Sequence, residues 1–257
     1  PTMLWALRNN AQVEAEHATR AAAVGSPVLT LELRKRFPHY AEFVMLGLAE
    51  GGHGDALRPL LPKSKADTYL AYNLRASIAR HGLLGCARIL QPKPLWWFNF
   101  GLAAVLASGN VEFVQWVVGS SAASLNGATI SFAVDSGSVP LLRWLREEGA
   151  TFTPALTRSA AKGGHLEALR WLVALGYPVD ERDVLAAASG GHNHVLAYLV
   201  DEGAPLTSDA LLRAAARGHL STVRFMLQHE CPVDEAQVAT HACRSRDDRV
   251  LRWWVDE

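Results

Sequence analysis

The chain has 257 residues, of which 49% are apolar and 19% are charged, and its acidic and basic residues balance to a formal net charge of zero. This composition favours a folded, core-forming protein over a disordered one. It lacks the basic excess that is usual in polyanion-binding proteins, and no apolar run reaches the roughly 18–20 residues needed to cross a bilayer.

The first part of the chain, residues 1–37, is predicted to hold one helix and a connector. The helix covers about residues 8–23. The connector is the segment "SPVLTLELRKRFP", in which Pro27 and Pro38 interrupt regular structure.

Residues 38–96 are predicted to form divergent helix pairs. The stretch "AEFVMLGLAEGGHGDALRPLL" begins at residue 41 and places a glycine directly before His53. The stretch "TYLAYNLRASIARHGLLGCARIL" begins at residue 68 and follows the same outline more loosely.

Residues 97–257 repeat a pattern with a period of 27 residues, and such a repeat decides the fold before any motif does. The histidine column, His165, His192 and His219, follows glycine at this interval, and Asn110 and Ser138 take its place earlier. An aromatic column has steps of 27 or 28 residues: Trp116, Trp144, Trp171, Tyr198, Phe225 and Trp253. Helix-capping residue types step by 27: Asn99, Asn126, Thr153, Asp180, Thr207 and Asp234.

These columns predict a unit of helix, tight glycine turn, second helix and short loop. Apolar side chains cover most of the second helix, leaving Glu167, Arg170 and Ala174 as a narrow polar stripe. Such a helix needs cover on both sides; the first helix of its own unit provides one side only, so neighbouring units must provide the rest. We therefore predict an all-α solenoid of stacked helix-turn-helix units, with about eight helix pairs from residue 38 onward.

The unit A-A-x-x-G-H-L-E-x-L-x-x-L-x-x-x-G-x-P-x-D resembles the ankyrin repeat, most closely at residues 160–180 and 215–234. The segment "TPAL" at residues 153–156 is similar to the Thr-Pro-Leu-His that opens a repeat of that family, which implies that Thr153 caps and Pro154 is the first helical residue. Family repeats have about 33 residues. The shorter repeats here, of a kind found in large DNA viruses, algae and protists, imply short loops without β-hairpin fingers.

The histidine column has two interpretations. One is a ladder of metal sites or bases; the other, which we favour, is a turn residue that bonds to the backbone of a neighbouring repeat, as the resemblance implies. Catalytic sites need different groups that converge on one point, not one group repeated along a rod. His192 and His194 are two residues apart, so a helix would direct them about 200° apart and prevent a shared ion unless the helix is broken there.

His229, Cys231, His241 and Cys243 supply the ligand types of a zinc site, but the spacing fits no known finger. Small buried cysteines are the favoured interpretation. We predict no catalytic residue, no metal and no cofactor, and hence no enzyme. The three cysteines are too few for a disulfide framework, which indicates an intracellular, reducing compartment, with the cytoplasm favoured and the nucleus or an organelle left open.

Arginines on the second helices would either track phosphates or form a solvated face, and acidic neighbours favour the solvated face: Arg143, Arg170, Arg224 and Arg252. The aromatic column would either stack on bases or pack in the core, which we favour. Trp253 and Trp254 have no downstream repeat to cover them, so either further repeats follow or this end docks on a partner.

We expect the exposed face of the first helices to bind a protein partner. This first-helix surface comprises Ser131, Asp135, Arg158, Lys162, Leu185, Ser189, Arg213 and Arg217. The predicted function is that of a non-catalytic protein-binding scaffold or adaptor. Two alternatives remain open: an RNA-associated helical-repeat protein, such as an organellar assembly factor or ribosome-bound subunit, and a substrate-recruiting arm of a larger ligase or effector.

Overall fold

The computed structural model describes residues 15–36, 41–57, 76–90, 94–119, 125–243 and 249–256. In these ranges the chain forms α-helices joined by turns and short loops, and it contains no strand. The predicted all-α fold of stacked helix pairs, without hairpin fingers in its described loops, is therefore confirmed. The chain divides into two compact units, residues 1–120 and residues 121–257.

The first unit contains a smaller set of described helices. They are α2 (Ala15–Ala23), α3 (Pro27–Arg36), α4 (Ala41–Glu50), α5 (Gly54–Leu57), α7 (Leu84–Leu90), α8 (Pro94–Ala107) and α9 (Val111–Val118). Helix α2 packs along α4, and α8 packs against α9. Part of the segment predicted as a divergent helix pair from residue 68, and the start of the predicted helix at residues 8–23, lie outside the described residues.

The predicted connector at the start of the chain is largely helical, since α3 covers Pro27–Arg36. Proline is tolerated as the first residue of a helix, where its missing N–H needs no partner. Ser26 precedes it and accepts hydrogen bonds at its backbone oxygen from Thr30 N at 2.9 Å and from Thr30 Oγ1 at 2.9 Å. A proline that was interpreted as an interruption therefore begins a helix.

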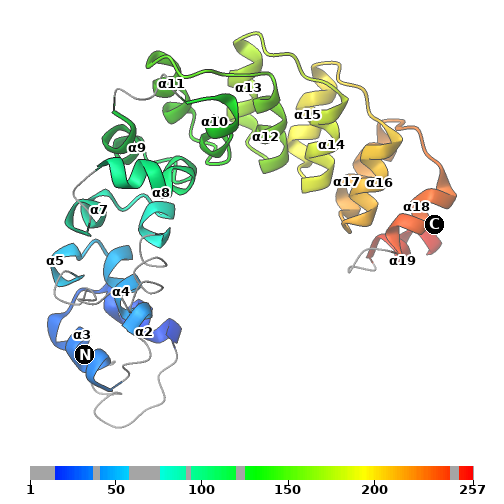
Figure 1. The fold of residues 1–257 in the computed structure, drawn as a ribbon. Coiled ribbons are helices and arrows are strands. Elements are labelled where there is room, and N and C mark those ends of the chain that lie inside the picture. Colours follow the sequence, from blue (N-terminus) through cyan, green and yellow to red (C-terminus); the bar gives the residue numbers. More distant parts are fainter. Residues whose placement is uncertain are drawn as a thin grey trace. The chain divides into compact units, whose positions relative to one another are not determined.

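The second unit is a regular stack of five described helix pairs. The first helices are α10 (Gly127–Val134), α12 (Ala155–Gly163), α14 (Glu181–Gly190), α16 (Ser208–Ala216) and α18 (Glu235–Ala242). The second helices are α11 (Val139–Glu147), α13 (Leu166–Ala174), α15 (Asn193–Asp201), α17 (Leu220–Gln228) and α19 (Arg249–Asp256). First helices stack on first helices and second on second, which gives two layers (Figure 1).

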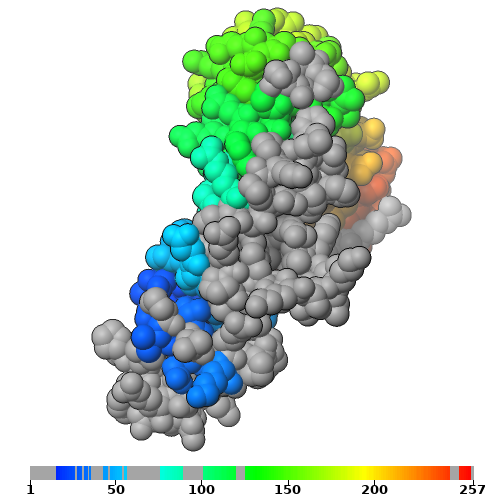
Figure 2. Space-filling view, turned by 60° about the vertical axis from the view of Figure 1, so that its left-hand side comes forward, coloured from blue at the N-terminus to red at the C-terminus, as the bar shows by residue number. Residues whose placement is uncertain are grey.

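The core of the second unit lies between these two layers. Leu169 of α13, Leu196 of α15 and Val223 of α17 are fully buried. Helix α13 contacts α15 and α15 contacts α17, and in the space-filling view the green and yellow residues form one continuous mass (Figure 2). Each pair is therefore covered by its neighbours, as the apolar second helices require.

Side-chain caps fix the starts of most first helices in this unit. Asn126, Asp180, Thr207 and Asp234 each accept a hydrogen bond from a backbone N–H in the first turn, as predicted. Thr153 does not cap, because α12 begins one residue later than expected, with Pro154 in the N-cap position. The prediction for Asn99 is also wrong: α8 begins at Pro94 and runs through residue 99.

Candidate partner-binding surface

A groove crosses the first helices α12, α14 and α16 in the second unit. Its volume is about 470 Å³. This basic groove is lined by Arg158, Lys162, Arg182, Leu185, Ala186, Ser189, Gly190, Arg213 and Arg217. Six of the eight residues of the predicted first-helix surface thus lie around one depression, whereas Ser131 and Asp135 of the α10 region lie outside its lining.

The helical repeat explains which side chains meet in the groove. Residues four apart on a helix lie on one face, which brings Arg158 next to Lys162 on α12 and Leu185 next to Ser189 on α14. Arg182 was not predicted, although it lies three residues before Leu185 and hence on the same face of α14. The same three-residue step, applied to the sequence, would have found it.

The lining of the basic groove carries five cationic side chains and no carboxylate. None of the five forms an ion pair within 4 Å in the part of the chain that the structure describes. Lys162 and Arg217 lie at the carboxyl ends of their helices, where the helix dipole favours a positive charge. Arg182 lies in the first turn of α14, where the dipole disfavours one.

Arg158 differs from the other cations of the basic groove in the burial of one of its donor atoms. Its Nε atom is buried and has no hydrogen-bond partner, although it is a donor. The carboxylate of Asp183 interacts electrostatically with Arg158; it is 2% exposed, and burial raises its pKa above the ordinary value of 3.8. Asp183 is already occupied, because its Oδ1 accepts from Thr157 Oγ1 and its Oδ2 from Asp180 N.

The histidine column joins each repeat to the one before it. His192 Nε2 lies 3.0 Å from the backbone oxygen of Lys162, and His219 Nε2 lies 3.1 Å from that of Ser189. Because a carbonyl oxygen only accepts, the ring nitrogen is the donor in both bonds. Burial lowers the pKa of His192 below its usual value, which keeps this ring neutral at physiological pH. The column therefore supports the helix ends that carry two residues of the basic groove.

A glycine in each preceding turn makes room for the histidine ring. A Cβ atom placed on Gly137 would lie 2.6 Å from His165 Nδ1, and one on Gly164 would lie 2.6 Å from His192 Nδ1. In the first unit, His53 packs over Gly25 in the same manner, and its Nε2 lies 3.0 Å from the backbone oxygen of Ala23. The joint between α2 and α4 therefore has the geometry of the joints in the regular repeats.

Two side chains that replace histidine in this column act as helix caps. Asn110 Oδ1 accepts from Phe113 N, and its Nδ2 donates to Gly82 O at 2.9 Å. Ser138 Oγ accepts from Leu141 N. The histidines do not cap their own helices. At this position of the repeat, histidine therefore bonds to the preceding repeat, serine caps its own helix, and asparagine does both.

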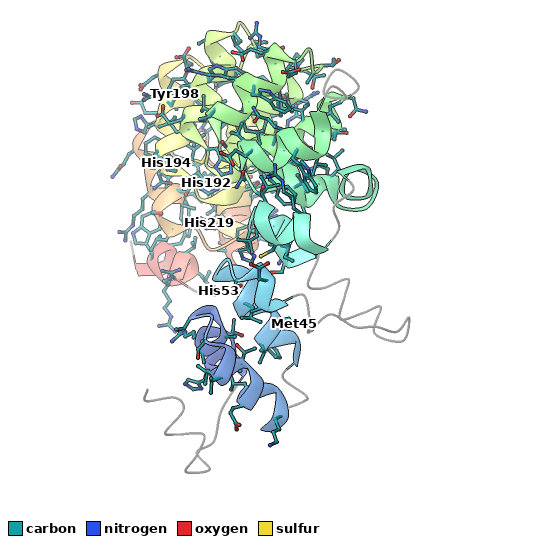
Figure 3. All side chains as sticks on the ribbon, turned by 90° about the vertical axis from the view of Figure 1, so that its left-hand side faces the viewer. Met45, His53, His192, His194, Tyr198 and His219 are labelled. Atoms are coloured by element: carbon teal, nitrogen blue, oxygen red, sulfur yellow. The ribbon has the colours of Figure 1, made fainter. Side chains whose placement is uncertain are left out.

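His192 and His194 lie side by side, contrary to the prediction from the helical wheel (Figure 3). Their ring centroids are 6.0 Å apart, because His192 is the N-cap residue of α15 and has a non-helical backbone. His194 Nε2 lies 2.9 Å from Gly164 O. Both rings thus bind the backbone of the preceding turn.

Substitution of His192 by alanine is expected to lower the free energy of unfolding by about 1 kcal/mol, since one net hydrogen bond between repeats is lost. Urea unfolding followed by circular dichroism measures this change. Metal analysis of the purified wild-type protein serves as the second readout, with no bound metal expected. Stoichiometric zinc that disappears in the alanine variant would contradict the structural interpretation.

Three of the four residues considered as zinc ligands make separate contacts, and the expectation of buried cysteines is wrong for the fourth, because Cys243 is exposed. Cys231 is buried and its thiol donates to Thr207 O, and burial raises its pKa to about 11, which disfavours the thiolate that binds metal. His229 stacks on Phe225 with ring centroids 4.3 Å apart. His241 Nδ1 lies 2.9 Å from Gln237 O. Within the described ranges, no three His, Cys, Asp or Glu side chains are placed to hold an ion together.

Arginines of the second helices cover the aromatic column. The guanidinium of Arg170 lies 5.3 Å from the ring of Tyr198 in the next repeat, and that of Arg224 lies 5.0 Å from the ring of Trp253. Arg88 covers Trp116 in the first unit in the same way. These contacts are cation–π interactions between successive repeats. Trp253 also contacts Trp254, and its buried Nε1 has no hydrogen-bond partner.

The chain was compared with known protein families and with curated proteins, and its described helices were searched for membrane spans. No described helix is long and apolar enough to cross a membrane. No curated protein matches the chain, but residues 156–237 match the family model for ankyrin repeats in three copies. Ankyrin repeats generally mediate protein–protein interaction. Residues 156–237, which carry the basic groove, therefore belong to the ankyrin repeat family.

Proposed function

We propose that the chain is a protein-binding scaffold that receives its partner on the first helices of the second unit. One observation carries the proposal: six residues expected on the exposed first-helix face line a single groove. Stacked helix pairs hold such a surface rigid, so a partner binds without ordering the scaffold, which lowers the entropic cost of association.

The two faces of the second unit differ in how their arginines are used, and this supports the first-helix side. Arg170 and Arg224 on the second helices lie over aromatic rings of the next repeat. Arg213 and Arg217 on α16 are exposed. Charged side chains without an internal contact are available to a partner, whereas Arg170 and Arg224 stabilise the stack.

Photo-cross-linking tests the proposal. A benzoylphenylalanine introduced at Ser189, in the basic groove, is expected to capture a defined set of proteins from a cell extract treated with ribonuclease. The same group at Glu167, which is exposed on α13, is the matched control and is expected to capture none of that set. Equal capture from both positions would refute a binding surface on the first helices. Capture from Ser189 that occurs in an untreated extract and is lost after ribonuclease treatment would favour the RNA-associated alternative.

A further inference from the structure

We propose that the basic groove binds an acidic segment of a partner protein, with two carboxylate clusters that flank an apolar residue. The inference rests on the proposed function, because it names the chemistry of the partner that the scaffold would receive. The basic groove is defined by five cations and by Leu185, Ala186, Ser189 and Gly190.

Four of the five cations of the basic groove form two clusters on either side of an apolar centre, and the fifth, Arg182, lies between them at the start of α14. Arg158 and Lys162 lie on α12, and Arg213 and Arg217 lie on α16 and its carboxyl end. Helix α14 lies between these two helices and contributes Leu185 and Ala186. A ligand that matches this pattern carries negative charge at both ends and an apolar side chain in the middle.

The spacing of the helices sets the spacing of the ligand charges. Packed helices lie about 8–10 Å apart, so the axes of α12 and α16 are about 16–20 Å apart. An extended chain spans that distance in about five or six residues. The long arginine and lysine side chains reach inward, so carboxylates about four to six residues apart would contact both clusters at once.

Two of the cations are poorly explained by the fold alone. Arg182 lies in the first turn of α14, where the positive end of the helix dipole repels it. Arg158 is half-buried and holds a buried Nε donor without a hydrogen-bond partner. A carboxylate that binds these groups would form charge-assisted hydrogen bonds, which are stronger than neutral ones.

The lining favours a peptide over a nucleic acid. Proteins that bind single strands combine cations with aromatic side chains on which bases stack. The basic groove has no aromatic residue in its lining, and its centre is aliphatic. Its volume of about 470 Å³ suits a few amino-acid side chains.

Fluorescence anisotropy with three labelled probes tests the proposal on the full chain. The first probe is a short peptide in which two Glu-Glu pairs, about five residues apart, flank a leucine. The second has glutamine in place of each glutamate, and the third is an oligouridine. We expect the acidic peptide to bind at least about tenfold more tightly than the glutamine peptide, and more weakly as salt rises. Tighter binding of oligouridine than of the acidic peptide would overturn the proposal in favour of RNA.

The double variant Arg213→Glu/Arg217→Glu is expected to weaken binding of the acidic peptide at least about tenfold, because it reverses one cluster. The matched control is Arg143→Glu/Arg146→Glu on α11, which makes the same charge change at exposed positions away from the basic groove and is expected to alter affinity less than about twofold. Circular dichroism of both variants checks their folding. The single variant Arg182→Gln gives an independent, smaller loss if the double variant does not fold.

Two further outcomes would overturn this inference: equal binding of the acidic and glutamine peptides, or equal losses in the groove variant and its control. If either occurs while the group at Ser189 still captures proteins, the scaffold function stands and only the acidic nature of its partner is wrong. If capture at Ser189 fails as well, the proposed function fails with it.

Discussion

Substitution of Gly164 by alanine is expected to lower the free energy of unfolding by about 2–3 kcal/mol, from about 1–2 kcal/mol of backbone strain and about 1 kcal/mol for one lost hydrogen bond. Gly164 has a φ of +75°, a left-handed conformation that costs an L-residue about 1–2 kcal/mol. Its new Cβ would also lie 2.6 Å from His192 Nδ1, which forces the ring away and breaks its bond to Lys162 O. Urea unfolding followed by circular dichroism measures the loss.

Gly176 provides the matched control for this substitution. It has a φ of +90°, but a Cβ placed on it meets no heavy atom within 4 Å. Gly176→Ala is therefore expected to show the backbone strain alone, about 1–2 kcal/mol. If the two variants lose the same stability, the histidine joint contributes nothing to the stack.

Asp183→Ala is expected to destabilise the protein by about 1–3 kcal/mol at neutral pH, because buried donors lose their acceptor. The Asp183 carboxylate accepts from Thr157 Oγ1 at 2.9 Å, which links α14 to α12, and from Asp180 N at 2.7 Å, which completes a capping box. Asp209→Ala is the control, since Asp209 is an exposed acid in the first turn of α16, and it is expected to cost less than about 1 kcal/mol.

The pH dependence of this loss follows from the raised pKa of Asp183. Burial makes the folded-state pKa higher than the ordinary 3.8, so between these two values the folded protein holds the proton more often than the unfolded chain. The stabilising contribution of protonation is fully present below 3.8 and is lost as pH rises through the folded-state pKa. The difference in stability between the wild type and Asp183→Ala is therefore expected to be larger near pH 4 than at pH 7. A difference that shrinks on acidification would contradict the burial of this carboxylate.

Periodicity predicted the features that every repeat shares. The spacing of His165, His192 and His219 showed that one side chain recurs at the length of a repeat, and the resemblance to ankyrin repeats implied that it joins neighbouring repeats. The helix pairs and most of the groove residues followed from the same register. The repeat length does not determine the residue at which each helix begins. The predictions for Asn99 and Thr153 were wrong for this reason.

Features that depend on a single residue's backbone were missed for a physical reason. The expected separation of His192 and His194 assumed a helix through both, but a cap residue has its own backbone angles and turns its side chain elsewhere. Pro27 was interpreted as a break because proline is usually one, whereas at the first position of α3 it is compatible with a helix. Arg182 was missed because only two positions per helix were considered, although a third shares their face.

The histidine joints also make the repeats of the second unit interchangeable. Each joint takes its ring from one repeat and its glycine from the repeat before, and the same fit recurs at Gly137, Gly164 and Gly191. Removal or duplication of one whole repeat would bring a histidine of this column back onto a glycine of the same geometry. The array can therefore gain or lose complete repeats in evolution. The position of the groove along the array can shift in this way while every joint keeps the same histidine–glycine contact.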